Sequence, residues 1–240
     1  VRRPTPLRRR GDAVARRSDG AGAQRTHTPV EVQVPLPIRA HHHERQCDIS
    51  RQFVNLHRAP AGDHLASAAM ESCEGCGFVY DLDRAEDAGA AVRAAAAELA
   101  EVMGRAERPA VRREPDTWSP LEYACHVRDV LVVQRERVLR ARREDTPVIT
   151  PMGRDERVEH DGYADQDPDA VARQLADAAQ MFANVLSRLG ARDWQREVAY
   201  NYPLLTERSL RWVAVHTVHE VAHHLGDVRR QVDDEGGTRP

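Results

Sequence analysis

The sequence predicts an all-α protein, a four-helix bundle that follows a disordered N-terminal extension. Two observations support this prediction. Four long segments in the C-terminal two thirds of the chain repeat apolar residues at helical spacing, and two of them start with a capping residue followed by proline. No convincing pair of strands lies between these segments. Four amphipathic helices without strands bury their apolar faces against one another, which gives a bundle.

The first two helices have clear boundaries. The first is expected over Asp83–Met103, an alanine-rich stretch. The second begins sharply, because Ser119 as N-cap, Pro120 at the first helical position and Glu122 at the third form a capping box. This helix is expected to continue to about Arg143.

The third helix is expected to begin with Asp167 as N-cap and Pro168 at its first position, and to end at Gly190. The fourth is expected over about Thr206–Val232, with no proline in its interior. The linkers before these two helices, residues 146–167 and 191–205, are long for a bundle. They are candidates to cover one end of a functional site.

The first 69 residues differ from the rest of the chain. They are rich in arginine and proline and have few large apolar residues, so residues 1–69 are expected to be a disordered extension. Residues 70–240 are expected to form the domain. Met70 is the first methionine, and a start assigned too early would explain the extension. No signal peptide, membrane span or disulfide framework is recognisable, which favours a cytoplasmic protein with reduced thiols and no membrane partner.

Charge and composition narrow the functional classes. The formal net charge is −3, so no global basic field favours nucleic acid as a partner. The 35 basic residues are all arginine, and this bias, together with the many alanines, indicates a GC-rich genome such as that of an actinobacterium.

The most informative segment runs from His216 to Asp227. It places five potential metal ligands within nine positions of the fourth helix. Glu220 and His224 are four residues apart and therefore share a face on which they can hold one ion. The second helix adds His126, which lies within its apolar arc. The sequence therefore predicts a metal held between two helices, with coordination positions left open.

Helical phase separates the clustered residues. Steps of about 100° per residue place Glu220 and His224 beside the apolar stripe of the fourth helix. The same steps turn His219 and His223 towards the face that should contact water, and leave His216 between the two faces. The predicted metal ligands are therefore His126, Glu220 and His224. The alternative is a polar, hydrogen-bonded bundle interior with histidines on its surface.

These motifs resemble the DinB-like (YfiT-like) superfamily, in the segments Trp118–Asp129 and His216–Asp227, over about residues 82–232. The resemblance implies a four-helix bundle with a metal bound by one histidine of the second helix and an i, i+4 pair of the last. Many members carry histidine at both positions of that pair. Glu220 in place of the first is similar to the mycothiol-dependent maleylpyruvate isomerase branch, whose ligand set is His, Glu, His.

The resemblance and the open ligand set predict a metal-dependent thiol (mycothiol) S-transferase or isomerase that acts on a small electrophilic substrate. Zinc suits the ligands, while iron, nickel and manganese stay open. One alternative is a metal-dependent hydrolase, and another is a non-catalytic, metal-stabilised module with a stress or partner-binding role. The expected partners are the substrate and a low-molecular-weight thiol, and a homodimer is compatible with the sequence.

A second motif, Cys73-Glu-Gly-Cys76-Gly77, has the form of half a zinc knuckle, in which two thiolates lie on a tight turn. No second CxxC follows, and Cys47 and Cys125 are not at knuckle spacing. A structural zinc completed by distant residues and a pair of simple reduced thiols are equally compatible with this motif. A redox pair ranks below both.

Overall fold

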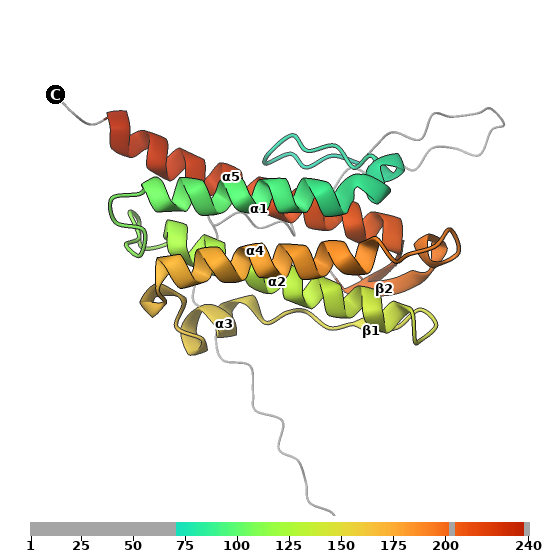
Figure 1. Ribbon diagram of the computed structural model, residues 1–240. Helices are drawn as coiled ribbons and strands as arrows, with labels where there is room; N and C mark the ends of the chain where they lie inside the picture. The colour runs from blue at the N-terminus through green and yellow to red at the C-terminus, as the bar shows by residue number, and fades with distance from the viewer. Residues whose placement is uncertain (1–70, 202–204, 238–240) are drawn as a thin grey trace, which may run out of the picture. The chain divides into compact units, whose positions relative to one another are not determined.

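Four long helices form the bundle that the sequence predicts (Figure 1). The computed structural model describes residues 71–201 and 205–237, all within one structural unit of residues 42–240. The predicted disorder of residues 1–69 lies outside the described residues. The four helices are α1 (Ala88–Arg105), α2 (Pro120–Ala141), α4 (Pro168–Leu186) and α5 (Leu210–Gly237).

Both predicted capping signals are confirmed. Ser119 Oγ accepts a hydrogen bond from Glu122 N at 3.2 Å, and Glu122 Oε2 accepts one from Ser119 N at 2.8 Å, which completes the capping box of α2. Asp167 caps α4 by accepting from Ala170 N at 2.7 Å. The first helix begins later than predicted, because Leu82–Asp87 forms a 3₁₀ turn, η2, before α1.

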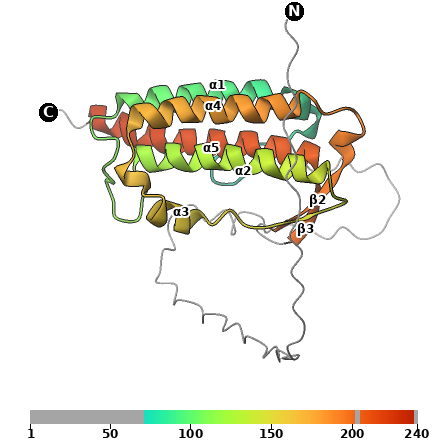
Figure 2. The ribbon, with the colours of Figure 1, turned by 60° about the horizontal axis from the view of Figure 1, so that its bottom comes forward.

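The helices pack in the cyclic order α1, α4, α2, α5, and Figure 2 shows α1 and α4 above α5 and α2. Buried residues such as Leu99, Leu131, Phe182 and Val213 fill the space between them. Gly89 lets α1 approach α4 closely, since a Cβ there would lie 3.2 Å from Cβ of Ala183. This packing places α2 beside α5, the two helices that carry the predicted ligands.

The expectation of no strand pairs is wrong. A three-stranded sheet lies at one end of the bundle, with β2 (Glu197–Asn201) between β1 (Val148–Ile149) and β3 (Leu205–Ser209). β1 pairs parallel to β2, and β2 pairs antiparallel to β3 with Tyr200 opposite Thr206. The last helix therefore begins at Leu210 rather than near Thr206, because residues 205–209 form a strand.

The two linkers are more ordered than their composition suggested. The first contains β1, the short helix α3 (Arg154–His160) and a 3₁₀ turn, η3 (Tyr163–Asp165). The second contains another 3₁₀ turn, η4 (Asp193–Gln195), and β2. Among the described residues, no helix is long and apolar enough to cross a membrane.

Residues 71–80, here called the knuckle segment, run beside α5 (Figure 1). A single antiparallel bridge joins Ser72 to Val79. Cys73 N donates to Phe78 O at 2.8 Å, and Gly77 N donates to Cys73 O at 2.7 Å. Gly77 has φ of 71°, a conformation that favours glycine. The CxxCG motif is therefore a tight turn at the tip of a small hairpin.

Candidate metal centre

All five ligand-type residues of α5 between His216 and His224 are buried. The helical phase correctly turns Glu220 and His224 towards α2. The expectation that His219 and His223 contact water is wrong, because their exposed fractions are 0% and 3%. They do lie on the opposite face of α5, but the knuckle segment covers that face.

His126, Glu220 and His224 converge between α2 and α5. Each offers one nitrogen or oxygen atom, and the three atoms lie within 4.8 Å of one another. The rings of His126 and His224 are nearly perpendicular, with centroids 5.0 Å apart. Two imidazoles and one carboxylate at this spacing can ligate one divalent ion and leave its remaining positions open.

Burial sets the protonation of this group. It lowers the pKa of His126 well below 6.5, so its imidazole is neutral, the form that binds metal. Burial raises the pKa of Glu220 above 4.5, and the neighbouring His224 opposes that rise. Nδ1 of His126 and Oε1 of Glu220 are buried without a hydrogen-bond partner. Such atoms are costly to bury unless an ion or water satisfies them.

His224 is oriented by a carboxylate. Its Nδ1 lies 2.8 Å from Oδ2 of Asp227, one turn further along α5. This contact favours the tautomer that protonates Nδ1, and it leaves Nε2, 4.0 Å from Oε2 of Glu220, as the nitrogen able to bind a metal. A carboxylate behind a histidine in this way fixes the orientation of the ring and its tautomer.

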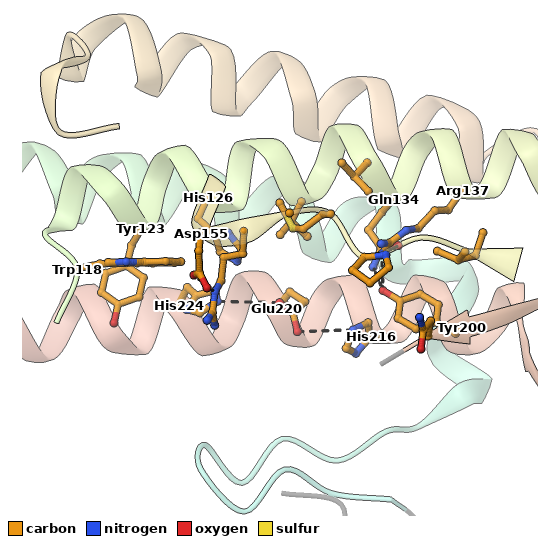
Figure 3. Close-up of a pocket in the computed structure, with 18 of the residues that line it drawn as sticks. Trp118, Tyr123, His126, Gln134, Arg137, Asp155, Tyr200, His216, Glu220 and His224 are labelled. Atoms are coloured by element: carbon orange, nitrogen blue, oxygen red, sulfur yellow. Dashed lines mark hydrogen bonds and ion pairs between the residues drawn. The ribbon is translucent and has the colours of Figure 1, made fainter. Parts of the chain in front are cut away.

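The three residues line a pocket of about 340 Å³ (Figure 3). Its walls are largely apolar and aromatic, with Trp118 and Tyr123 close to His224. Asp227 also lines the pocket. The volume suits a small molecule, and the polar group on the wall formed by α5 offers the fixed contact that such pockets use for orientation.

The other end of the pocket is polar and hydrogen-bonded. Nε2 of Gln134 and Nη1 of Arg137 donate to the Tyr200 hydroxyl at 3.0 and 2.6 Å. Desolvation raises the pKa of Tyr200 to about 12, so its hydroxyl stays protonated. Asn201, the neighbour of Tyr200 at the end of β2, also lines the pocket.

The segment from β1 to α3 lines another side of the pocket, as expected for the first linker. Arg154 lies there, with its guanidinium 5.5 Å from the centre of the Trp118 ring. Arg157 instead donates to Asp129 at 2.9 Å, and His160 is exposed on α3. Of these three basic residues, Arg154 lines the pocket, while Asp129 holds the guanidinium of Arg157.

Two residues near this site were not assigned a role in advance. His216 lines the pocket, with Nε2 3.6 Å from Oε1 of Glu220. Tyr80 lies behind α5, and its hydroxyl is 3.0 Å from Nδ1 of His216 and 2.9 Å from Nδ1 of His219. The intermediate phase of His216 pointed in this direction, but no local pattern could place Tyr80, 136 residues earlier in the chain.

The comparisons with known proteins agree with this architecture. The family model described as the DinB superfamily matches residues 81–228. The chain belongs to the DinB superfamily. The matched residues contain all four helices of the bundle except the last part of α5, and include His126, Glu220 and His224.

One solved DinB-like structure is similar to this chain, YfiT from Bacillus subtilis, described as a probable metal-dependent hydrolase with an unusual four-helix bundle topology. The TM-score is 0.58 at 15% sequence identity, over 65% of this chain and 89% of that one. At this identity the likeness concerns the fold. A comparison with curated proteins gives no match.

Proposed function

We propose that this DinB-superfamily chain is a metal-dependent enzyme whose ion is held by His126, Glu220 and His224. The observation that carries the proposal is the convergence of these three side chains at a pocket, with buried polar atoms that have no hydrogen-bond partner. A neutral His126 and a His224 oriented by Asp227 fit a divalent ion. Zinc is the ion we propose, since two imidazoles and a carboxylate are a ligand set of catalytic zinc sites.

A divalent ion at this position lowers the pKa of a thiol or water that it binds, so that either becomes a nucleophile at neutral pH. The chain's own residues position the molecules that react. Trp118 and Tyr123 offer apolar contacts, and Gln134 and Arg137 hold the Tyr200 hydroxyl at the far end. Arg154 presents a cation for an anionic group on the substrate or thiol.

The first candidate reaction is transfer of a low-molecular-weight thiol, such as mycothiol, to a small electrophile, or an isomerisation through such an adduct. Glu220 supports this reading, because it is similar to the ligand of the mycothiol-dependent branch at a position where many relatives carry histidine. The second candidate is hydrolysis, in which water replaces the thiol. The description of YfiT as a probable metal-dependent hydrolase favours it.

Turnover assays separate the candidates. Purified protein, stripped of metal and reloaded with zinc, is offered generic electrophiles with and without mycothiol, and then a panel of esters, amides and phosphodiesters. The proposal predicts activity that needs metal and is lost in Glu220→Ala, and a requirement for the thiol identifies transfer. Exposed His160 provides a matched control, and His160→Ala should keep the activity. Absence of metal-dependent turnover across the panel would favour the non-catalytic module.

A further inference from the structure

The face of α5 opposite the pocket holds a second cluster of metal-binding side chains. Cys73, Cys76, His219 and His223 each offer one atom, and the four atoms lie within 4.8 Å of one another. Sγ of Cys73 is 3.8 Å from Nδ1 of His223. In a tetrahedral zinc site with bonds of about 2.3 Å to sulfur and 2.0 Å to nitrogen, neighbouring ligand atoms are about 3.3–3.8 Å apart. Small movements therefore bring these four atoms to tetrahedral positions.

We propose that Cys73, Cys76, His219 and His223 form a structural zinc site that fastens the knuckle segment to α5. Two thiolates on a tight turn and two histidines one helical turn apart are the ligand set of many structural zinc sites. The ligands come from positions almost 150 residues apart, as the pair Cys73 and His223 illustrates. The ion therefore joins two distant parts of the chain.

The backbone of the knuckle segment is already folded for this role. The hydrogen bond from Gly77 N to Cys73 O closes the turn, and the positive φ of Gly77 lets the chain return after Cys76. Cys73 is buried against α5, while Cys76 lies at the exposed tip of the turn. Both sulfurs are nonetheless in reach of the two histidines.

The two histidines are also oriented for ligation. Nδ1 of His219 is engaged with the Tyr80 hydroxyl, which leaves Nε2, buried and without a hydrogen-bond partner, to bind metal. His223 turns Nδ1 towards Cys73, and its Nε2 is 3.9 Å from Oδ2 of Asp227. His219 thus has a hydrogen-bond partner on its second ring nitrogen, as metal-bound histidines usually do, whereas Nε2 of His223 is buried near Asp227 without a hydrogen bond.

The clusters divide without sharing a residue. His126, Glu220 and His224 form one set, and the two cysteines with His219 and His223 form the other. Two further groups, His216/His219/Glu220 and His223/His224/Asp227, each borrow residues from both sets. They are better understood as contacts between neighbouring sites than as separate sites, since each would remove a ligand from both.

The proposed zinc also bears on the pocket. By fixing the knuckle segment it fixes Tyr80, whose hydroxyl contacts both His219 and His216. His216 in turn lies 3.6 Å from Glu220. Figure 3 shows the pocket on one side of α5 and the knuckle segment on the other. The zinc therefore fixes Tyr80, and through the Tyr80 hydroxyl it helps to orient His216 beside Glu220.

Cobalt spectroscopy tests this site separately from the pocket. Cobalt(II) bound to thiolate gives a sulfur-to-metal charge-transfer absorption, and the pocket group contains no sulfur ligand. The full chain, stripped of metal under reducing conditions and titrated with cobalt, should develop this band together with tetrahedral d–d bands, and added zinc should abolish both. This measurement uses the wild-type protein alone, so it does not depend on whether a variant folds. Absence of the charge-transfer band in the reduced protein would overturn the proposal.

Variants assign the band to the residues. Cys76→Ser should remove most of it, and His223→Ala should weaken and shift it. Glu220→Ala should keep the band in full, so that loss of the pocket metal and loss of this site are distinguishable. Cys125→Ala is the matched cysteine control, because Cys125 is buried near Tyr163 on the far side of α2. A band that survives in Cys76→Ser and disappears in Cys125→Ala would contradict the assignment.

Discussion

The two faces of α5 bury similar residues in different surroundings. Towards α2, Glu220 and His224 meet His126 at a pocket of about 340 Å³. On the opposite face, His219 and His223 meet two cysteines of the knuckle segment, one of them buried. Three nitrogen and oxygen ligands beside a cavity leave room for a substrate. Four ligands that include two thiolates complete a tetrahedron and leave none. In the proposed arrangement, access to the ion, more than the number of histidines, decides which of the two groups can do chemistry.

The largest effect that separates the faces concerns activity. Glu220→Ala should lower metal-dependent turnover about a thousandfold or more, because the ion contributes several kcal/mol to transition-state stabilisation. Steady-state kinetics with saturating zinc measure it. Glu136→Ala, at an exposed position of α2, is the control. Equal activity of the two variants would mean that Glu220 does not hold a catalytic ion.

The second effect concerns stability. Cys76→Ser should lower the free energy of unfolding by about 4 kcal/mol when free zinc is a thousandfold above its dissociation constant, because that zinc binds the folded state alone. Urea unfolding with and without a chelator measures the difference. If the chelator left the free energy of unfolding of the wild type unchanged, the face of α5 with the two cysteines would not hold a stabilising zinc.

A smaller effect concerns the carboxylate behind His224. Asp227→Asn should weaken zinc binding at the pocket about 10- to 100-fold, because the ring loses the charged partner that orients it. Competition with a chromophoric chelator gives the affinity, and the cobalt–thiolate band reports the other face. A variant in which both affinities fall equally would show that Asp227 supports both sites through His223 as well.

The smallest effect concerns the link between the faces. Tyr80→Phe removes the hydroxyl that contacts Nδ1 of both His216 and His219. It should cost about 1–2 kcal/mol of stability, since buried ring nitrogens lose a partner, while both ions stay bound. Urea unfolding and metal analysis check this. Loss of either ion would mean that Tyr80 is required for the ligand geometry.

Local sequence signals were enough to predict most of the fold. The starts of α2 and α4 followed from Ser119 and Asp167 because capping depends on residues three positions away. Helical phase also depends only on nearby residues of the same helix, so it predicted that Glu220 and His224 point inward. Phase could not reveal what covers the other face of α5. His219 and His223 are buried there by a segment about 140 residues earlier in the chain.

The sequence did not predict the sheet, because most of its strands carry no recognisable local pattern. Val148–Ile149 is only two residues long, and Leu205–Ser209 is exposed or partly exposed throughout, so neither shows an alternation of buried and exposed residues. Only Glu197–Asn201 alternates, with Val198 and Tyr200 buried. Strands this short depend on their partners rather than on their own pattern.

Metal stoichiometry tests the central claim, that α5 holds one ion on each face, most directly. Zinc per chain is measured by elemental analysis after dialysis in the wild type, in Glu220→Ala, in Cys76→Ser and in the double variant. Two ions are expected in the wild type, one in each single variant and none in the double variant. A single ion in the wild type that either substitution alone removes would contradict it, because the two faces would then share one site.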